Sequence, residues 1–260
     1  MRLDQPSAGQ LTLNGLQMDA QTRLNPREQA RQIQYIFQDP LGSLNPRKTI
    51  RQILDTPLKL LRGLPAAQRH TAMQQLIESV NMRPQVLERY PHEFSGGQAQ
   101  RIGIARALAA QAKILILDEP VSALDVSIQA QVLKLLAELK AEFNLSYLFI
   151  SHDLSVVEGV SDRVAVMYFG RFVEIGPART LFNTPRHPYT RVLLDSAPVP
   201  GQRLRHDQRQ MAELPDPLNP PPGCAFAPRC PQAQARCREQ APELAGITHS
   251  VACHFPLDRL

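Results

Sequence analysis

The chain has 260 residues, of which 43% are hydrophobic, so it can bury the core of one large domain or of a domain with an extension. Its net charge is +5 and its pI about 9.2, which suits phosphate-bearing partners, although an ordinary solvated surface explains this charge equally well. Basic residues do not cluster with aromatic ones, no apolar run approaches about 18 residues, and the N-terminus is no signal peptide. These features disfavour nucleic-acid binding and predict a soluble protein that reaches a membrane only by docking onto other subunits.

The first 180 residues alternate between strand-like and helix-like patterns. Short strands are expected at residues 11–13 and 33–37. Helical periodicity runs from about residue 45 to 83, with Pro65 at a helix start, and again over residues 99–110. Apolar runs at residues 114–117 and 147–150 end in polar residues, as buried parallel strands do when their carboxyl ends carry chemistry. Between these runs a helix is expected from apolar residues at helical spacing, namely Val126, Leu133, Leu136 and Leu139. The alternation predicts α/β architecture.

The last third of the chain changes in composition. Residues 164–168 and 172–175 flank Gly170 and predict a hairpin. Beyond it, 13 of the 23 prolines fall in the last 76 residues, which predicts an irregular extension from about residue 184.

A serine followed by two glycines precedes the predicted helix at residues 99–110. Ser95, Gly96 and Gly97 would offer unobstructed backbone N–H groups, a hydroxyl and the positive end of a helix dipole, a combination that binds phosphate. The alternative is a serine N-cap with a flexible glycine turn. The surrounding motifs decide between the two.

Five strings occur in the order and spacing typical of ABC ATPases, and residues 1 to about 180 resemble that family. Phe94-Ser95-Gly96-Gly97-Gln98 resembles the signature motif, residues 114–119 resemble the Walker B strand, and residues 121–125 match the D-loop. His152 takes the place of the switch histidine, and Phe37-Gln38-Asp39-Pro40 matches the Q-loop. The resemblance implies a P-loop NTPase-like α/β domain over residues 1–183, with a helical subdomain inserted at about 45–110.

The resemblance also implies roles for individual residues in the hydrolysis of ATP. Asp118 would hold Mg²⁺ through water, Glu119 would be the general base, and His152 would contact the γ-phosphate. The nucleotide-binding residues implied are Gln38, Ser95, Gly96, Gly97, Gln98, Asp118 and Asp125. A serine-protease triad from residues 151–153 is a poor alternative, because three consecutive residues cannot assemble one at a single strand end.

The phosphate-binding loop of the family is absent from these residues. It needs Gly-x-x-x-x-Gly-Lys-Ser/Thr, and none of the five lysines of the chain follows a glycine. Residues 2–10 resemble the segment that follows the P-loop helix, so the sheet is expected to be incomplete. The hypotheses are a start assigned too far downstream or a truncated gene, and alternatively a natural degenerate subunit that lends only its signature motif to an intact partner. The chain alone is expected to be inactive.

The extension over residues 184–260 resembles the C-terminal region of ATPase subunits from oligopeptide/dipeptide importers, which include nickel and glutathione importers. Residues 37–47 are also typical of that group, and the extension distinguishes the chain from a non-transport ABC ATPase. The four cysteines, Cys224, Cys230, Cys237 and Cys253, lie within 30 residues and lack paired C-x2-C spacing. They suggest a metal site, and the resemblance implies a [4Fe–4S] cluster, with free reduced thiols as the alternative.

The resemblance therefore implies the ATP-binding subunit of a peptide-type importer on the cytoplasmic face of the membrane. Its partners would be two membrane permeases, a second ABC ATPase subunit and, indirectly, an extracytoplasmic binding protein. Residues 38–89 would form the groove that receives the coupling helix of a permease.

Overall fold

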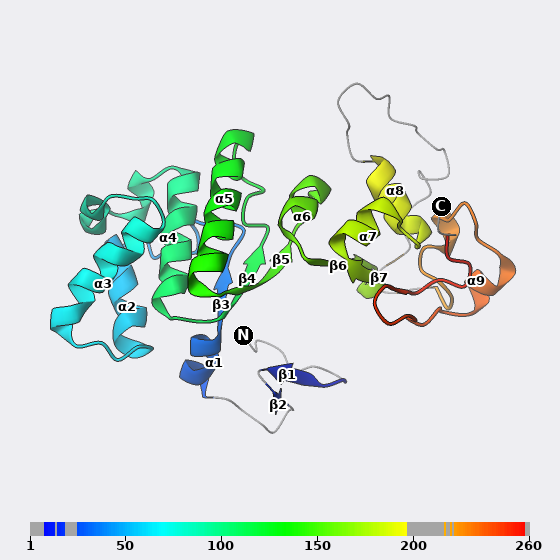
Figure 1. The fold of residues 1–260 in the computed structure, drawn as a ribbon, viewed down its shortest axis with the longest axis horizontal. Helices are drawn as coiled ribbons and strands as arrows, with labels where there is room; N and C mark the ends of the chain where they lie inside the picture. Colours follow the sequence, from blue (N-terminus) through cyan, green and yellow to red (C-terminus); the bar gives the residue numbers. More distant parts are fainter. Residues whose placement is uncertain are drawn as a thin grey trace. The chain divides into compact units, whose positions relative to one another are not determined.

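A computed structural model of the chain describes residues 8–13, 15–18, 25–196, 216, 219 and 221–257. Residues 2–7, part of the segment that resembles the one after the P-loop helix, lie outside the described residues, as do residues 197–215, 217, 218, 220 and 258–260 of the extension. The chain divides into two compact units, Met1–His152 and Asp153–Leu260, which are described one at a time (Figure 1). The domain boundary predicted between residues 183 and 184 stays a prediction.

The Met1–His152 unit begins with a hairpin of β1 (Leu11–Leu13) and β2 (Leu16–Met18), paired antiparallel. Helix α1 (Pro26–Gln32) follows, capped by Asn25, and runs directly into β3 (Ile33–Ile36). The N-cap works in both directions: the Asn25 side chain accepts from Arg27 N at 3.0 Å, and the Glu28 carboxylate accepts from Asn25 N at 3.3 Å. The predicted strand at residues 33–37 is thus confirmed, one residue shorter at its end.

The helical region consists of α2 (Ile50–Leu60), α3 (Ala66–Ser79), two 3₁₀ turns (Pro84–Glu88 and Pro91–Glu93) and α4 (Gly96–Ala109). The helical pattern predicted from residue 45 starts later, because Thr49 caps α2 through a capping box with Gln52. Pro65 takes the N-cap position of α3. Ile50, Leu54 and Leu58 are fully buried on one face of α2, which packs against α3 and α4.

The sheet of this unit has the order β3-β4-β5, and all three strands are parallel. Strand β4 (Ile114–Asp118) is central, and α5 (Val126–Phe143) connects it to β5 (Ser146–Ile150). One face holds the fully buried Leu115 and Leu117, and beside them the Tyr147 hydroxyl donates to the Leu136 carbonyl of α5 at 2.9 Å. That face is therefore covered by helix.

The opposite face of β5 is more exposed than the sequence predicted. The predicted burial of residues 147–150 is wrong for Leu148 and Ile150, which are 55% and 44% exposed. Their side chains alternate to the face opposite Tyr147 and the buried Leu115 and Leu117. The helix predicted after residue 125 is confirmed as α5, in which Val132 and Leu135 are buried and Val126, in the first turn, is 81% exposed.

The Asp153–Leu260 unit is built on a hairpin. Strands β6 (Arg163–Tyr168) and β7 (Arg171–Pro177) pair antiparallel through Phe169 and Gly170, both with positive φ, which confirms the predicted hairpin. Helix α6 (Leu154–Val160) precedes it, and α7 (Ala178–Asn183) and α8 (Pro188–Ser196) follow. The extension adds a 3₁₀ turn (Ala227–Arg229), α9 (Ala235–Glu239) and the two-residue β8 (Ser250–Val251), which pairs with β7.

A buried carboxylate joins the extension to the hairpin. Glu174 of β7 is 0% exposed and accepts from the backbone N–H groups of Arg186 at 2.7 Å and His187 at 3.0 Å. A ring nitrogen of His249, Nε2, lies 2.7 Å from the same carboxylate. His187 is itself buried, and loss of solvation lowers its pKa to about 4, which keeps it neutral. Aromatic packing of Phe226 against Tyr168 and Tyr189 completes this core.

Candidate nucleotide-hydrolysis site

Polar side chains meet at the carboxyl ends of the three parallel strands. Asp118 is the last residue of β4 and Glu119 the next, while Gln38 follows β3 and His152 follows β5 by two residues each. Because these strands are parallel, their carboxyl ends share one edge of the sheet. Glu119 has a φ of +45°, and its N–H donates to the Ile150 carbonyl at 2.9 Å, so the chain turns sharply there.

Glu119 is the centre of this cluster. Gln38 Nε2 donates to its Oε2 at 2.7 Å, and His152 Nδ1 lies 2.8 Å from its Oε1. The hydrogen bond from His152 is the main cause that lowers the pKa of Glu119, against a smaller opposing effect of burial. The carboxylate is therefore ionised and held from two sides, by residues that lie 81 and 33 positions away in sequence.

Asp118 has a separate partner that the sequence did not reveal. Tyr35 of β3 pairs in register with Ile116, and its hydroxyl donates to Asp118 Oδ2 at 2.5 Å. This hydrogen bond, together with burial and the negative charge of Asp118, raises the pKa of Tyr35 to about 12. The two adjacent carboxylates are thus held by different donors. The alternation of side chains along β3 was the signal that could have placed Tyr35 on the Asp118 face.

Removing the Asp118 carboxylate should change the titration of Tyr35. In Asp118→Ala we expect one additional tyrosine to titrate near its ordinary pKa of about 10, because its acceptor and the neighbouring negative charge are gone. The measurement is ¹³C NMR of tyrosine ring carbons against pH, with Tyr35→Phe to assign the resonance. Asp125→Ala is the matched control and should leave that resonance unchanged. An unchanged Tyr35 resonance in Asp118→Ala would refute the hydrogen bond.

The signature residues form a second group at the start of α4. Ser95 Oγ lies 3.5 Å from Gln98 N, and Gln98 Oε1 accepts from Ser95 N at 3.1 Å, so the two residues build a capping box. A Cβ on Gly97 would lie only 2.5 Å from Ile128 Cγ2 of α5, and one on Gly96 would lie 3.4 Å from Leu124. The glycines therefore also permit close packing against α5 and the segment before it. Asp125 is the N-cap residue of α5, and its side chain makes no capping hydrogen bond there.

Arg106 of α4 connects the two groups and was missed from the sequence. Its Nη1 donates to the Ser43 carbonyl, in the loop that follows Gln38, at 2.5 Å. Burial lowers the pKa of Arg106. The helix that begins with the signature residues is thereby fixed to the loop that carries Gln38.

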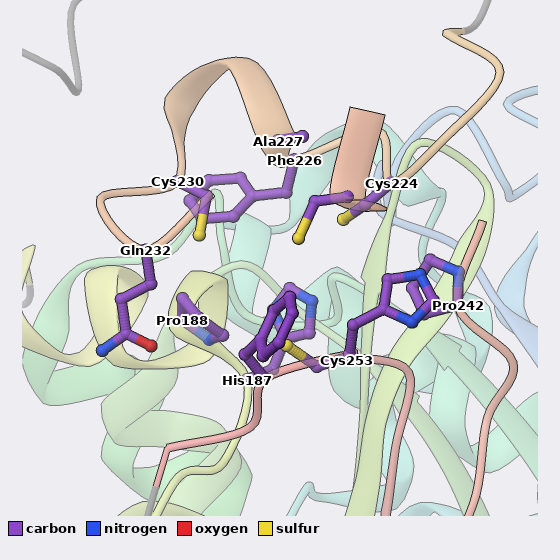
Figure 2. A pocket seen from close by; sticks show the side chains of 12 residues that line it. His187, Pro188, Cys224, Phe226, Ala227, Cys230, Gln232, Pro242 and Cys253 are labelled. Carbon is purple, nitrogen blue, oxygen red and sulfur yellow. The ribbon is translucent and has the colours of Figure 1, made fainter. Parts of the chain in front are cut away.

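The four cysteines of the extension line one small cavity, of about 20 Å³. Figure 2 shows Cys224, Cys230 and Cys253 around this space, with His187 and Phe226 nearby. The pKa of Cys253 is raised to about 11, mainly by burial and in smaller part by the charges of the other three cysteines. Within the described part of the chain, no three His, Cys, Asp or Glu side chains are arranged to hold a metal ion. A cavity of this size has room for about one water molecule.

Two parts of the chain match known protein families. Residues 1–122 match the family described as ABC transporter, and residues 173–237 match the family described as oligopeptide/dipeptide transporter, C-terminal region. The oligopeptide transport ATP-binding protein AppF of Bacillus subtilis is 49% identical over 98% of this chain and 79% of its own length. The chain belongs to the ATP-binding subunits of the oligopeptide/dipeptide ABC transporter family.

A second relative and two solved structures agree with this assignment. The di/tripeptide transport ATP-binding protein DppF of Pseudomonas aeruginosa is 46% identical over 97% of the chain and 79% of its own length. Among solved structures, cbiO1 from Clostridium perfringens, part of the ABC transporter complex cbiONQ, matches with a TM-score of 0.61 at 25% identity, over 70% of each chain. The ATP-binding cassette MJ0796 with ADP and Pi matches with a TM-score of 0.58 at 24% identity, over 68% of this chain and 76% of its own, which supports the fold. The predicted P-loop NTPase-type ABC ATPase fold is confirmed.

The described helices were compared with what a membrane span requires. None of them combines the length and the apolar character that a membrane span requires.

Proposed function

We propose that this chain is the energy-coupling subunit of a peptide-type ABC importer and acts in ATP hydrolysis at an interface between two ATPase subunits. The observation that carries the proposal is the Glu119 carboxylate held between Gln38 and His152, at the edge of the sheet that also presents Asp118. Phosphoryl transfer relies on positioning and charge stabilisation, and these are what this arrangement of fixed carboxylates and donors provides.

The residues at the strand ends would divide the work among them. Glu119 would accept the proton of the attacking water, and His152 would orient Glu119 and contact the γ-phosphate. Asp118, whose Oδ2 accepts from the Tyr35 hydroxyl, would hold a water of Mg²⁺ through its second oxygen. Gln38 would report on the occupancy of the site, because its amide now bonds the proposed base. Bound Mg²⁺ would neutralise charge on the phosphates.

The residues of this chain fit only one part of Mg-ATP. The carboxylates and donors suit Mg²⁺ and the terminal phosphate, whereas the 260 residues hold no Gly-rich lysine loop to cradle the other phosphates. In a second form of the proposal, the chain would lend only Ser95, Gly96, Gly97 and Gln98 to a nucleotide held by the P-loop of a partner subunit. In that form only one of the two composite sites is complete.

The partners follow from the family. ATPase subunits of peptide ABC importers work with membrane permease components, and we propose two permeases, a second ABC ATPase subunit and, indirectly, an extracytoplasmic binding protein. The chain would dock on the cytoplasmic face of the membrane through residues 38–89. Residues 1–183 would form the ATPase domain, with a helical subdomain at about 45–110, and residues 184–260 the extension.

The proposal is tested with the chain alone and in its complex. A polypeptide of these 260 residues is expected to show neither ATPase activity nor tight ATP binding, because a phosphate cradle is missing from it. Co-expressed with its permeases and a P-loop-bearing second subunit, it should co-purify with them, and the complex should hydrolyse ATP. Micromolar ATP affinity of the polypeptide alone would show that these 260 residues hold the phosphates without a P-loop, and would contradict this expectation. Failure to co-purify with any permease would contradict the transport function.

We also propose that the extension binds a [4Fe–4S] cluster. The observation that favours it is the meeting of Cys224, Cys230, Cys237 and Cys253 around one cavity, since four thiolates are a donor set for such a cluster. The cavity is too small for a cluster as it stands, so the segments that carry these cysteines would have to separate. Anaerobic purification followed by iron and acid-labile sulfide analysis tests it. A colourless, iron-free protein would support reduced free cysteines.

A further inference from the structure

A second cavity in the Asp153–Leu260 unit has a size suited to a small ligand. Its volume is about 360 Å³, within the range of roughly 300–1,000 Å³ typical of ligand pockets. The hairpin β6–β7 forms one wall, and two segments of the extension, residues 221–226 and 241–244, form the other. None of the residues assigned to ATP hydrolysis lines it.

The walls of this cavity are mostly apolar and aromatic. Tyr168 and Phe226 pack edge-to-face with ring centroids 5.4 Å apart, and the buried Val173 lies beside them. Towards the opening, Phe172 and Leu244 are 47% and 41% exposed. A ligand bound here would bury the exposed apolar side chains against a rigid aromatic core. The remaining lining includes three prolines, Pro221, Pro222 and Pro242.

Two charged residues complete the lining, one of each sign. Arg171 begins β7, and Glu243 lies in the extension segment across the cavity. Both are exposed, and no ion pair is recorded for either within the described ranges. A guanidinium binds a carboxylate, and a carboxylate binds an ammonium group. One cation, one anion and aromatic walls together complement a zwitterion with an apolar body. A polyanion such as a nucleotide would be repelled by the negative charge of Glu243.

We propose that this cavity binds a short zwitterionic peptide or amino acid with an aromatic or large apolar side chain. Arg171 takes the terminal carboxylate, Glu243 takes the terminal ammonium, and the side chain lies against Phe172 and Leu244. Binding itself does not depend on the role of the chain in transport. Only its consequence rests on the proposed function, since the products of a peptide importer belong to this class of compound.

The ligand cavity shares a wall with the cysteine cavity, which supplies a second readout. Cys224, Phe226 and Pro242 line both. The shared wall is tightly packed: Cys224 N donates to the Cys237 carbonyl at 2.8 Å, and a Cβ on Gly223 would lie 2.3 Å from that same oxygen. A ligand pressed against this wall will therefore change the access of reagents to Cys224.

The test is calorimetric titration of the full 260-residue chain with the dipeptide Ala-Phe, with free phenylalanine and with N-acetyl-phenylalanine amide. We expect saturable binding of a zwitterion, at least about tenfold weaker binding of the blocked amide, and slower alkylation of Cys224 in the complex. The stronger of Ala-Phe and phenylalanine identifies the source of the ligand. Arg171→Met and Glu243→Gln should each weaken binding about tenfold, because each removes one charge-assisted contact.

Matched exposed residues outside the cavity provide the controls. Arg179→Met and Glu239→Gln should bind like the unaltered chain. Absence of saturable binding for both zwitterions at millimolar concentration would overturn the proposal. So would equal affinity for the zwitterion and the blocked amide, or equal affinity in Arg171→Met and Arg179→Met, since either result would show that the charged ends are not recognised.

Discussion

Replacing Glu174 with alanine is expected to destabilise the Asp153–Leu260 unit by about 3–5 kcal/mol, the usual effect of removing one partner of a buried polar pair. The side chain has no exposed surface and accepts from three donors, the N–H groups of Arg186 and His187 and the ring of His249. Without the carboxylate, these donors lose their acceptor, at a cost of about 1–3 kcal/mol for each buried group that finds no water. Glu174→Gln, which keeps the shape and one acceptor oxygen, should cost less.

Hydrogen exchange measured by mass spectrometry can locate this effect in the full chain. Protection should fall in three segments together, β7, the start of α8 and residues 249–252, because the carboxylate is their common contact. Glu158→Gln, on the exposed side of α6 in the same unit, is the matched control and should change stability by no more than about 0.5 kcal/mol. A loss below about 1 kcal/mol for Glu174→Ala would show that water or another group satisfies the donors.

The cluster of Gln38, Asp118, Glu119 and His152 was largely predictable because its residues lie at or just after the ends of strands. Asp118, Glu119 and His152 each come after an apolar run, and parallel strands bring such ends to one edge. Tyr35 was not predictable in the same way. Its contact with Asp118, 83 positions away, depends on the register between β3 and β4, which no local pattern in the sequence specifies.

Burial was harder to predict than the elements themselves. The apolar run of β5 indicated a strand covered on both faces, yet only the face shared with Leu115 and Tyr147 is packed by α5. The proline content of residues 184–260 predicted an irregular extension, but it carried no information on β8 or on the contact of this segment with Glu174 of β7. The contact between Glu174 and His249 spans 75 positions, and no local pattern marks a buried carboxylate whose donors are mostly backbone groups.

The second large effect is expected at Gly97. Alanine at this position should reduce ATP hydrolysis by the assembled complex about 100-fold. The added Cβ would lie 2.5 Å from Ile128 Cγ2, so α4 and α5 must move apart by about 1 Å to restore ordinary van der Waals contact. Such a shift displaces the start of α4, and with it the signature residues Ser95 and Gln98, from α5. Overpacking of this kind also costs about 1–3 kcal/mol of stability.

Gly103→Ala is the control that separates packing from helix propensity. Gly103 lies in the same helix, and a Cβ there meets nothing within 4 Å, so alanine should raise stability by up to about 1 kcal/mol and leave hydrolysis unchanged. Propensity alone predicts the same gain at Gly97, whereas the contact with Ile128 predicts a loss, so the sign of the change decides between them. Thermal unfolding of the chain tests the packing, and ATP hydrolysis by the complex tests the role of the signature residues. If Gly97→Ala is destabilised but the complex remains fully active, the close contact is real and the signature group of this chain does not contribute to hydrolysis.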